Sequence, residues 1–256
     1  MAMDEDVLAC ARIVERGDPA RFAAVMAAPV PVRSRLFPIY AFNVEVARAP
    51  WVTQEPMIAE MRLQWWRDVL EEIRAGGPVR RHEVAVPLAH VLSPAGAGRL
   101  DALIDARRWD IAREPFEDHE DLCGYLRATS GGLLLTAAAA LGGAPEEPVL
   151  QAGFAQGVAN WFLAVPELER AGRKPLVDGR PEGVRALAME GQAALRAARR
   201  TTLPKPAHPA MLALWQTDAI LAQAAADPTR VADGTLLPPP FRSRLSLSLR
   251  ALTGRW

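Results

Sequence analysis

The sequence predicts an all-α fold, and three observations support this class. Apolar residues recur at helical spacing along almost the whole chain. No run of alternating β-branched residues bounded by hairpin turns interrupts that pattern. Neither an internal repeat nor a long Pro/Gly-rich linker divides the 256 residues, so we expect a single domain spanning 1–256.

Start and stop signals place the helices along the chain. Gly17 ends the first helix, Thr53 is the expected N-cap of the fourth, and Gly76 ends that helix. Ser93 is the expected N-cap of a later helix, and Asp118 begins a capping box that opens the next one. The expected helices are 4–16, 19–28, 31–48, 53–75, 82–92, 95–113, 118–141, 145–171, 181–201, 207–226 and 240–253, with a loop at 172–182.

The helix over 53–75 has the clearest amphipathic pattern. Its expected buried stripe consists of Ile58, Met61, Trp65, Val69 and Ile73. Trp66 falls outside this stripe, so we expect it to line a cavity or to contact a partner.

Charge and motifs exclude several classes of protein. The 30 Lys+Arg balance the 30 Asp+Glu, and a neutral chain is unlike a general nucleic-acid binder, which needs a basic excess. The sequence has no nucleophile elbow and no glycine-rich phosphate loop after a strand. Serine-hydrolase and nucleotide-loop chemistry are therefore not expected.

Cysteine usage and hydropathy indicate a cytoplasmic chain. Cys10 and Cys123 are too few for a disulfide framework and show no metal-ligand spacing with the four histidines, so no metal site and no cofactor is assigned. Acidic residues at 4–6 stand where a signal peptide would be basic. The longest apolar stretch, 133–141, is shorter than the ~20 residues that cross a bilayer.

The last segment, 241–256, differs in charge from the rest of the chain. It holds four arginines and no acid, and Leu245, Leu249 and Leu252 share one helical face with Trp256. We expect this basic amphipathic helix to pack on the bundle with its basic side in solvent. Peripheral contact with the inner membrane is the alternative.

Four segments, in order, resemble the squalene/phytoene synthase family. They are 33–67, 103–110 with two aspartates five residues apart, 122–134 with a tyrosine and glycines, and 153–166 followed by Gly172-Arg173. The resemblance covers residues 18–177 and extends more loosely to the C-terminal remainder. It implies a helical bundle of the isoprenoid (terpenoid) synthase type, with Tyr40 and Tyr125 facing a central cavity.

Enzymes of this family join two prenyl diphosphates, and two aspartate motifs hold the Mg²⁺ that neutralises the diphosphate. This chain departs from both motifs. The positions that lack the family's residue are Val44, Ala47, Arg48, Trp51, Gly157, Leu163 and Ala164. Asn160 does match, but the charge of Arg48 would repel Mg²⁺. The resemblance therefore implies that the diphosphate chemistry has been lost.

The string AFNVEVA at 41–47 resembles one branch of the family more closely than the synthases. That branch includes the mitochondrial assembly factor for respiratory complex I, whose corresponding segment also lacks the aspartates. The resemblance implies an accessory or assembly factor, with complex I subunits or another protein as partner. Two alternatives stay open: a module that binds an isoprenoid or lipid, and an active Mg-dependent prenyl transferase with a relocated acidic set. That set would comprise Asp105, Asp110, Glu167 and Glu169.

The candidate cavity or ligand-binding residues are Tyr40, Glu45, Arg62, Trp66, Asp105, Asp110, Tyr125 and Asn160, and no catalytic residue is assigned. Asp105 and Asp110 lie about 140° apart round a helix, which favours surface ion pairs over one metal-binding face. Glu45 is the one carboxylate of the 31–48 helix. We expect it to pair with Arg48 or with an arginine of the next helix.

Overall fold

The chain is built from helices, as the sequence predicts. The computed structural model describes residues 5–237 and 240–256, without the side chains of Pro240, Arg242 and Ser243, and these residues contain no strand. Asp4, assigned to the first helix, falls outside them. The α-helices are α1 (Glu5–Gly17), α2 (Pro19–Ala27), α3 (Val30–Arg48), α4 (Pro56–Ala75), α5 (Ala85–Val91), α6 (Pro94–Ala106), α7 (Trp109–Ala112), α8 (His119–Leu126), α9 (Gly132–Ala140), α10 (Glu146–Arg170), α11 (Pro181–Ala198), α12 (His208–Met211), α13 (Thr217–Ala226), α14 (Thr229–Ala232) and α15 (Pro240–Thr253).

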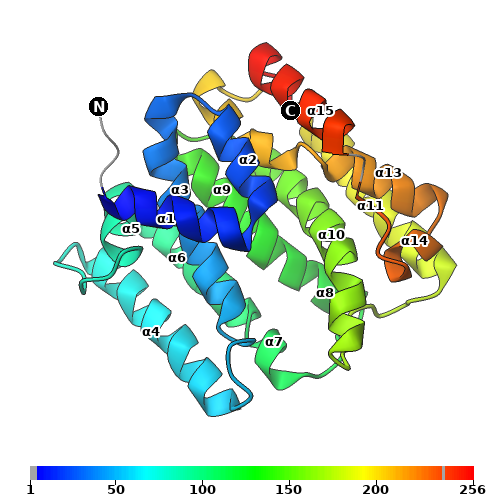
Figure 1. Ribbon diagram of the computed structural model, residues 1–256, viewed down its shortest axis with the longest axis horizontal. Helices are drawn as coiled ribbons and strands as arrows, with labels where there is room; N and C mark the ends of the chain where they lie inside the picture. The colour runs from blue at the N-terminus through cyan, green and yellow to red at the C-terminus, as the bar shows by residue number, and fades with distance from the viewer. Residues whose placement is uncertain (1–4, 238–239) are drawn as a thin grey trace.

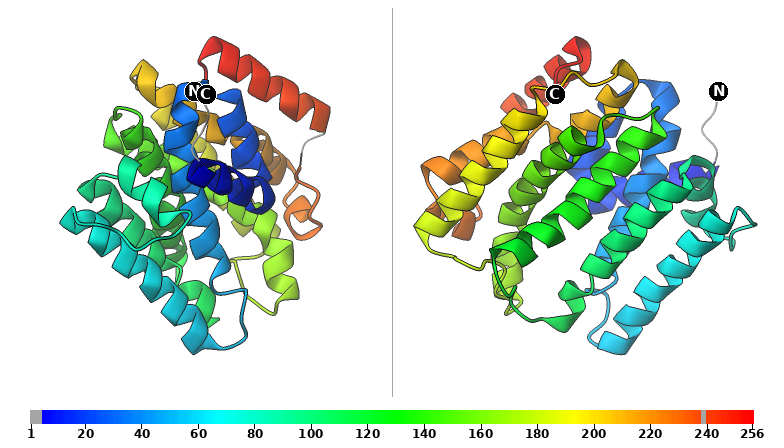
Figure 2. Two further views of the ribbon diagram at one scale, coloured as in Figure 1. Left: turned by 60° about the vertical axis from the view of Figure 1, so that its left-hand side comes forward. Right: turned by 180° about the vertical axis from the view of Figure 1, so that it is seen from behind.

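The long helix α10 is the centre of the packing. It contacts α9, α11, α13 and the π-helical segment Arg127–Gly131, which joins α8 to α9. Helices α4 and α7 lie at one end of the molecule and α15 at the other (Figure 1). Seen from behind, α4, α6, the joined α8 and α9, and α11 run side by side (Figure 2).

Two of the three expected N-caps are confirmed. Ser93 Oγ accepts the Gly96 N–H at 3.1 Å, and Asp118 Oδ1 accepts the Asp121 N–H at 2.9 Å. The assignment of Thr53 is wrong, because α4 begins only at Pro56 and the capping position is Glu55. Proline suits the first helical position because it has no N–H to leave unpaired.

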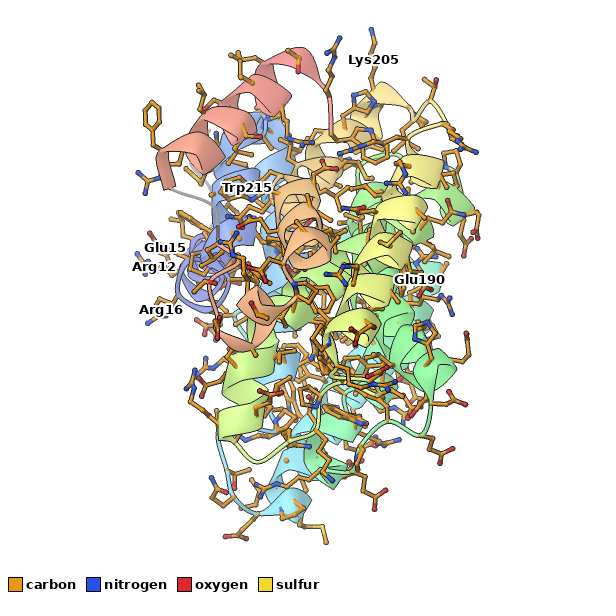
Figure 3. All side chains as sticks on the ribbon, turned by 90° about the vertical axis from the view of Figure 1, so that its right-hand side faces the viewer. Arg12, Glu15, Arg16, Glu190, Lys205 and Trp215 are labelled. Carbon is orange, nitrogen blue, oxygen red and sulfur yellow. The ribbon has the colours of Figure 1, made fainter. Side chains whose placement is uncertain are left out.

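Three long expected helices are interrupted. The segment 95–113 breaks between Ala106 and Trp109, and 118–141 contains the π-helical segment. After the first break, the side chain of Asp110 lies in the interior, where Arg107 and Tyr125 contact it. The segment 207–226 is divided around Trp215, whose indole N–H donates to the Ala20 carbonyl of α2 at 3.1 Å (Figure 3).

The buried face of α4 matches the expected stripe only near its C-terminal end, where Val69 and Ile73 are buried. Trp66 is 4% exposed and packs edge-on against Phe42 of α3, with ring centroids 5.2 Å apart. Met61 of the expected stripe is exposed, and Trp65 is half-buried. Trp66, which contacts α3, determines the buried face in the first part of α4. There the buried positions are Ala59, Leu63 and Trp66, one or two residues after the expected ones.

Close packing between α10 and the π-helical segment depends on glycine. A Cβ added at Gly153 would lie 2.6 Å from Gly131 Cα and 3.0 Å from the Ser130 carbonyl oxygen. We expect Gly153→Ala to lower the free energy of unfolding by about 1–3 kcal/mol, because two backbones would have to separate. The control Gly124→Ala meets nothing within 4 Å in α8, so it should stabilise by about 0.5–1 kcal/mol. Urea denaturation measures both, and equal effects would contradict this packing.

The C-terminal helix α15 presents its leucine face to solvent. It packs on α2 through Leu247, beside Trp215, whereas Leu245, Leu249 and Leu252 are exposed. The expectation that this helix packs on the bundle is confirmed, but the contact is made by the face of Leu247. Its basic side is not wholly in solvent, because Arg250 pairs with Asp218. Among the described helices, none combines the length and the apolarity needed to cross a bilayer.

Candidate functional site

The main interior cavity has a volume of about 590 Å³ and opens between α2, α3, α8 and α10. This volume lies in the usual range of about 300–1,000 Å³ for small-molecule sites. All seven positions that depart from the family's motifs line it: Val44, Ala47, Arg48, Trp51, Gly157, Leu163 and Ala164. The two segments that resemble the aspartate motifs therefore face one cavity.

Two candidate residues meet in a buried polar network at this cavity. Tyr125 donates its hydroxyl to Asp110 Oδ2 at 3.1 Å and accepts from Arg107 Nη1 at 2.6 Å. Arg107 Nη1 also lies 3.2 Å from Asp110 Oδ2. Burial raises the pKa of Tyr125 far above its usual range, although the Arg107 charge opposes the shift. Tyr125 therefore stays protonated and acts as a hydrogen-bond donor to Asp110.

A second buried arginine anchors the loop after α10. Arg173 donates to the Trp109 and Asp110 carbonyls, and its guanidinium lies 5.3 Å from the ring of Trp51 and 5.4 Å from that of Trp109. Burial lowers the pKa of Arg173. The loop expected at 172–182 is confirmed up to residue 180, where α11 follows from Pro181, and Arg173 ties the loop to α7.

Each carboxylate that lines the cavity is paired with an arginine. Asp18 pairs with Arg21 as it caps α2, Asp110 pairs with Arg107, and Glu167 pairs with the exposed Arg170. A carboxylate engaged by a guanidinium competes poorly for Mg²⁺, since the cation must displace a fixed positive charge. Of the relocated acidic set, Asp110 and Glu167 line this cavity, whereas Glu169 lines a different one and Asp105 neither.

Tyr40 lies in the core and does not line the cavity. It is 1% exposed, and its hydroxyl has no hydrogen-bond partner among the described residues. The guanidinium of Arg21 lies 5.6 Å from the ring centroid. Burial raises the pKa of Tyr40 to about 12. The expected cavity-facing position therefore holds for Tyr125 but is wrong for Tyr40, which α2 covers through Arg21.

Three other candidates surround a smaller cavity of about 240 Å³ on the other side of α3. Glu45, Arg62 and Trp66 line it together with Trp65 and His82. Glu45 pairs with Arg48 at 3.5 Å, as expected. The candidate set is thus divided between two cavities, with Asp110, Tyr125 and Asn160 in the larger one.

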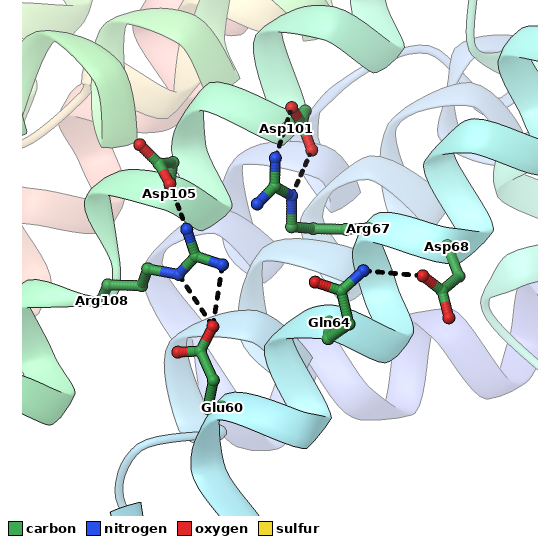
Figure 4. A network of polar contacts seen from close by, with 7 residues as sticks. All are labelled: Glu60, Gln64, Arg67, Asp68, Asp101, Asp105 and Arg108. Atoms are coloured by element: carbon green, nitrogen blue, oxygen red, sulfur yellow. Dashed lines mark hydrogen bonds and ion pairs between the residues drawn. The ribbon is translucent and has the colours of Figure 1, made fainter. Parts of the chain in front are cut away.

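Asp105 belongs to a surface network between α4 and α6 (Figure 4). Arg108 Nη1 lies 2.6 Å from Asp105 Oδ1, and Arg108 Nε donates to Glu60 at 2.9 Å. Arg67 pairs with Asp101 at 2.9 Å in the same network. The expectation that Asp105 and Asp110 lie on different faces holds, since one is exposed and the other is buried.

One cluster of potential metal ligands was not expected. His119, Cys123 and Glu190 bring their ligand atoms within 4.8 Å of one another. The expectation that Cys123 shows no metal-ligand spacing is wrong, because His119 precedes it by one helical turn. That spacing is visible in the sequence. The sequence does not predict Glu190 as the third member, because this residue belongs to α11 and approaches α8 only in the folded chain.

Comparisons with known proteins agree on family and fold. A family model described as squalene/phytoene synthase matches residues 14–176. The structure resembles a solved dehydrosqualene synthase, with a TM-score of 0.79 and 15% identity, covering 97% of this chain and 96% of that chain. It also resembles squalene synthase HpnC from Alicyclobacillus acidocaldarius, with a TM-score of 0.62 and 17% identity over 98% of this chain and 93% of that one.

Curated relatives carry a different description. The NADH dehydrogenase (ubiquinone) complex I, assembly factor 6 homolog of Drosophila melanogaster is 29% identical over 167 residues, which is 61% of this chain and 50% of the relative. The complex I assembly factor 6 of Homo sapiens is 25% identical over 162 residues, or 61% of this chain and 48% of the relative. The chain thus spans about half the length of the curated relatives that it matches.

Proposed function

Because this chain belongs to the squalene/phytoene synthase family but has no acid at the family's aspartate positions, we propose that it is a non-catalytic member that acts as an assembly factor. The observation that carries this proposal is the main cavity. Ala47, Arg48 and Trp51 meet Leu163 and Ala164 there, where the family's enzymes would concentrate carboxylates. The carboxylates that do line the cavity are each paired with an arginine, which leaves no free anionic set to hold the Mg²⁺ that activates a diphosphate.

Respiratory complex I is the proposed target of this assembly function. The relatives named as complex I assembly factor 6 support it, at 25–29% identity. The AFNVEVA string of α3, at 41–47, supports membership of that branch. Its residues Asn43, Val44 and Ala47 line the main cavity. The proposed partners are subunits of complex I.

An isoprenoid or lipid ligand of the main cavity is the second candidate. The volume of about 590 Å³ favours it, since the cavity is large enough for a small apolar molecule. Trp161 and Leu168 give it an apolar wall beside the polar network of Asp110. A bound isoprenoid would require no metal and no reaction.

One experiment separates these readings. The purified chain is incubated with farnesyl or geranylgeranyl diphosphate and Mg²⁺, beside an active synthase of the family as positive control, and organic extracts are analysed by mass spectrometry. We expect no C30 or C40 product, because the cavity lacks a metal-binding acidic set. Any such product would overturn the non-catalytic proposal. An isoprenoid or quinone in the extract before substrate is added would support the second candidate.

We also propose that α15 makes peripheral contact with an anionic membrane surface. Phe241, Leu245, Leu249 and Leu252 are exposed on it, and Arg244 and Arg255 add positive charge. The segment 240–256 contains no acid, which suits anionic headgroups. Arg250 contributes less, because it pairs with Asp218 of α13 at 2.9 Å.

Vesicle binding measures this contact. We expect sedimentation with vesicles that contain phosphatidylglycerol, weakened by salt, and little binding to neutral phosphatidylcholine. Leu252→Ser should weaken binding about tenfold, since it removes most of the apolar area of one leucine. Met57→Ser, at another strongly exposed apolar position, on α4 at the far end of the molecule, should leave it unchanged. Equal binding of both variants and the unmodified chain would exclude α15 as the contact.

A further inference from the structure

The cluster of His119, Cys123 and Glu190 joins two helices on the side of α8 turned away from the main cavity. Cys123 precedes Tyr125 by two residues, which places it about 200° round the helix from that cavity residue. None of the three side chains lines either cavity described above. Helices α8 and α11 both pack on α10, and these side chains connect them to each other. The cluster is therefore independent of the cavity and of the function proposed for it.

The ligand atoms already lie at the spacing of a metal site. His119 Nε2 is 2.8 Å from Glu190 Oε2, Cys123 Sγ is 3.4 Å from His119 Nε2, and Cys123 Sγ is 3.9 Å from Glu190 Oε1. Ligands of a tetrahedral zinc, at about 2.0–2.3 Å from the ion, lie roughly 3.3–3.8 Å from one another. Shifts of about half an ångström, within reach of rotation of the exposed His119 and Glu190 side chains, would suffice.

The donor set selects the kind of metal. One imidazole nitrogen, one sulfur and one carboxylate oxygen suit a borderline-soft divalent ion, whereas Mg²⁺ and Ca²⁺ prefer oxygen ligands alone. His119 and Cys123 are four residues apart on α8, so one helix face presents both. The site is also accessible, since the His119 side chain is 56% exposed and that of Glu190 is 38% exposed.

From this geometry we propose that His119, Cys123 and Glu190 form a Zn²⁺ site that joins α8 to α11. Three protein ligands leave the fourth position of the ion to water, on the solvent side where His119 and Glu190 are exposed. The thiol of Cys123 releases its proton to solvent when the ion binds. The ion replaces a histidine–glutamate hydrogen bond with a three-ligand link between the helices.

Cobalt(II) is the probe, because a thiolate bound to tetrahedral Co²⁺ gives a characteristic absorption. The reduced, chelator-treated full chain is titrated with Co²⁺ and then with Zn²⁺. We expect one Co²⁺ per chain, thiolate absorption, and displacement by Zn²⁺. Cys123→Ser should abolish the absorption. His119→Gln and Glu190→Gln should weaken Zn²⁺ binding by more than the roughly 10–100-fold that loss of an outer partner costs.

The matched controls are Cys10→Ser, at the other buried cysteine, and His90→Gln, at an exposed helical histidine. Both should leave the titration unchanged. Because a buried cysteine variant can lose its fold, thermal unfolding of Glu190→Gln gives a second readout. At 100 times the Kd, Zn²⁺ should raise the Tm of the unmodified chain by about 5–10 °C, and the variant should lose this rise. Absence of thiolate absorption, or its retention in Cys123→Ser, would overturn the proposal.

Discussion

Asp110→Ala should lower the free energy of unfolding by about 3–5 kcal/mol, because it removes one partner of a buried ion pair. Asp110 is 3% exposed, and without it Arg107, whose side chain is 20% exposed, keeps a largely buried charge with no carboxylate beside it. The Tyr125 hydroxyl also loses its acceptor. For a chain of this length the Tm should fall by about 6–20 °C. Calorimetry or urea denaturation measures the loss.

Asp105→Ala is the matched control. It breaks an arginine pair of the same i, i+3 spacing, but both of its side chains are substantially exposed. Solvent screens this pair, so the loss should stay below about 1 kcal/mol. If the two variants lowered the free energy of unfolding equally, burial of the polar network at the cavity would add nothing to its stabilising effect, which contradicts this prediction.

Helical periodicity predicts where most helices of this fold begin and end. It predicts less well which side of a helix is buried. The ends of α3 and α10 fall within one or two residues of the expected bounds, because glycine, proline and apolar spacing act locally. In the first part of α4 the buried face differs from the predicted one, because either of two adjacent tryptophans, Trp65 or Trp66, fits the helical spacing of apolar residues. Contact of Trp66 with Phe42 decides between them, and that contact is not local in the sequence.

The candidate site shows the same division. The positions that the sequence predicts to lack the family's aspartates are Ala47, Arg48, Trp51 and Ala164, and they all line one cavity. Asp110 and Asp105 were correctly separated by helical geometry. Their different burial could not be predicted, because a break between α6 and α7 and the distant Tyr125 determine it.

The second large effect is genetic. Deleting the gene for this chain in its own organism should abolish most membrane-bound NADH dehydrogenase activity and reduce assembled complex I, because an assembly factor acts before the enzyme is complete. Supplying the chain again should restore assembly. The Asp105→Ala variant should restore it as well, since its fold is nearly unchanged. Asp110→Ala should restore it less, in proportion to the folded protein that remains.

The most direct measurement is complex I assembly in the deletion strain supplied with an active synthase of the same family. The active synthase provides the prenyl transferase reaction but not the proposed assembly function. We expect complex I to stay unassembled with the synthase and to assemble with the chain. Normal assembly after deletion would contradict the assembly function. Rescue by the synthase would contradict the claim that this family member acts without catalysis.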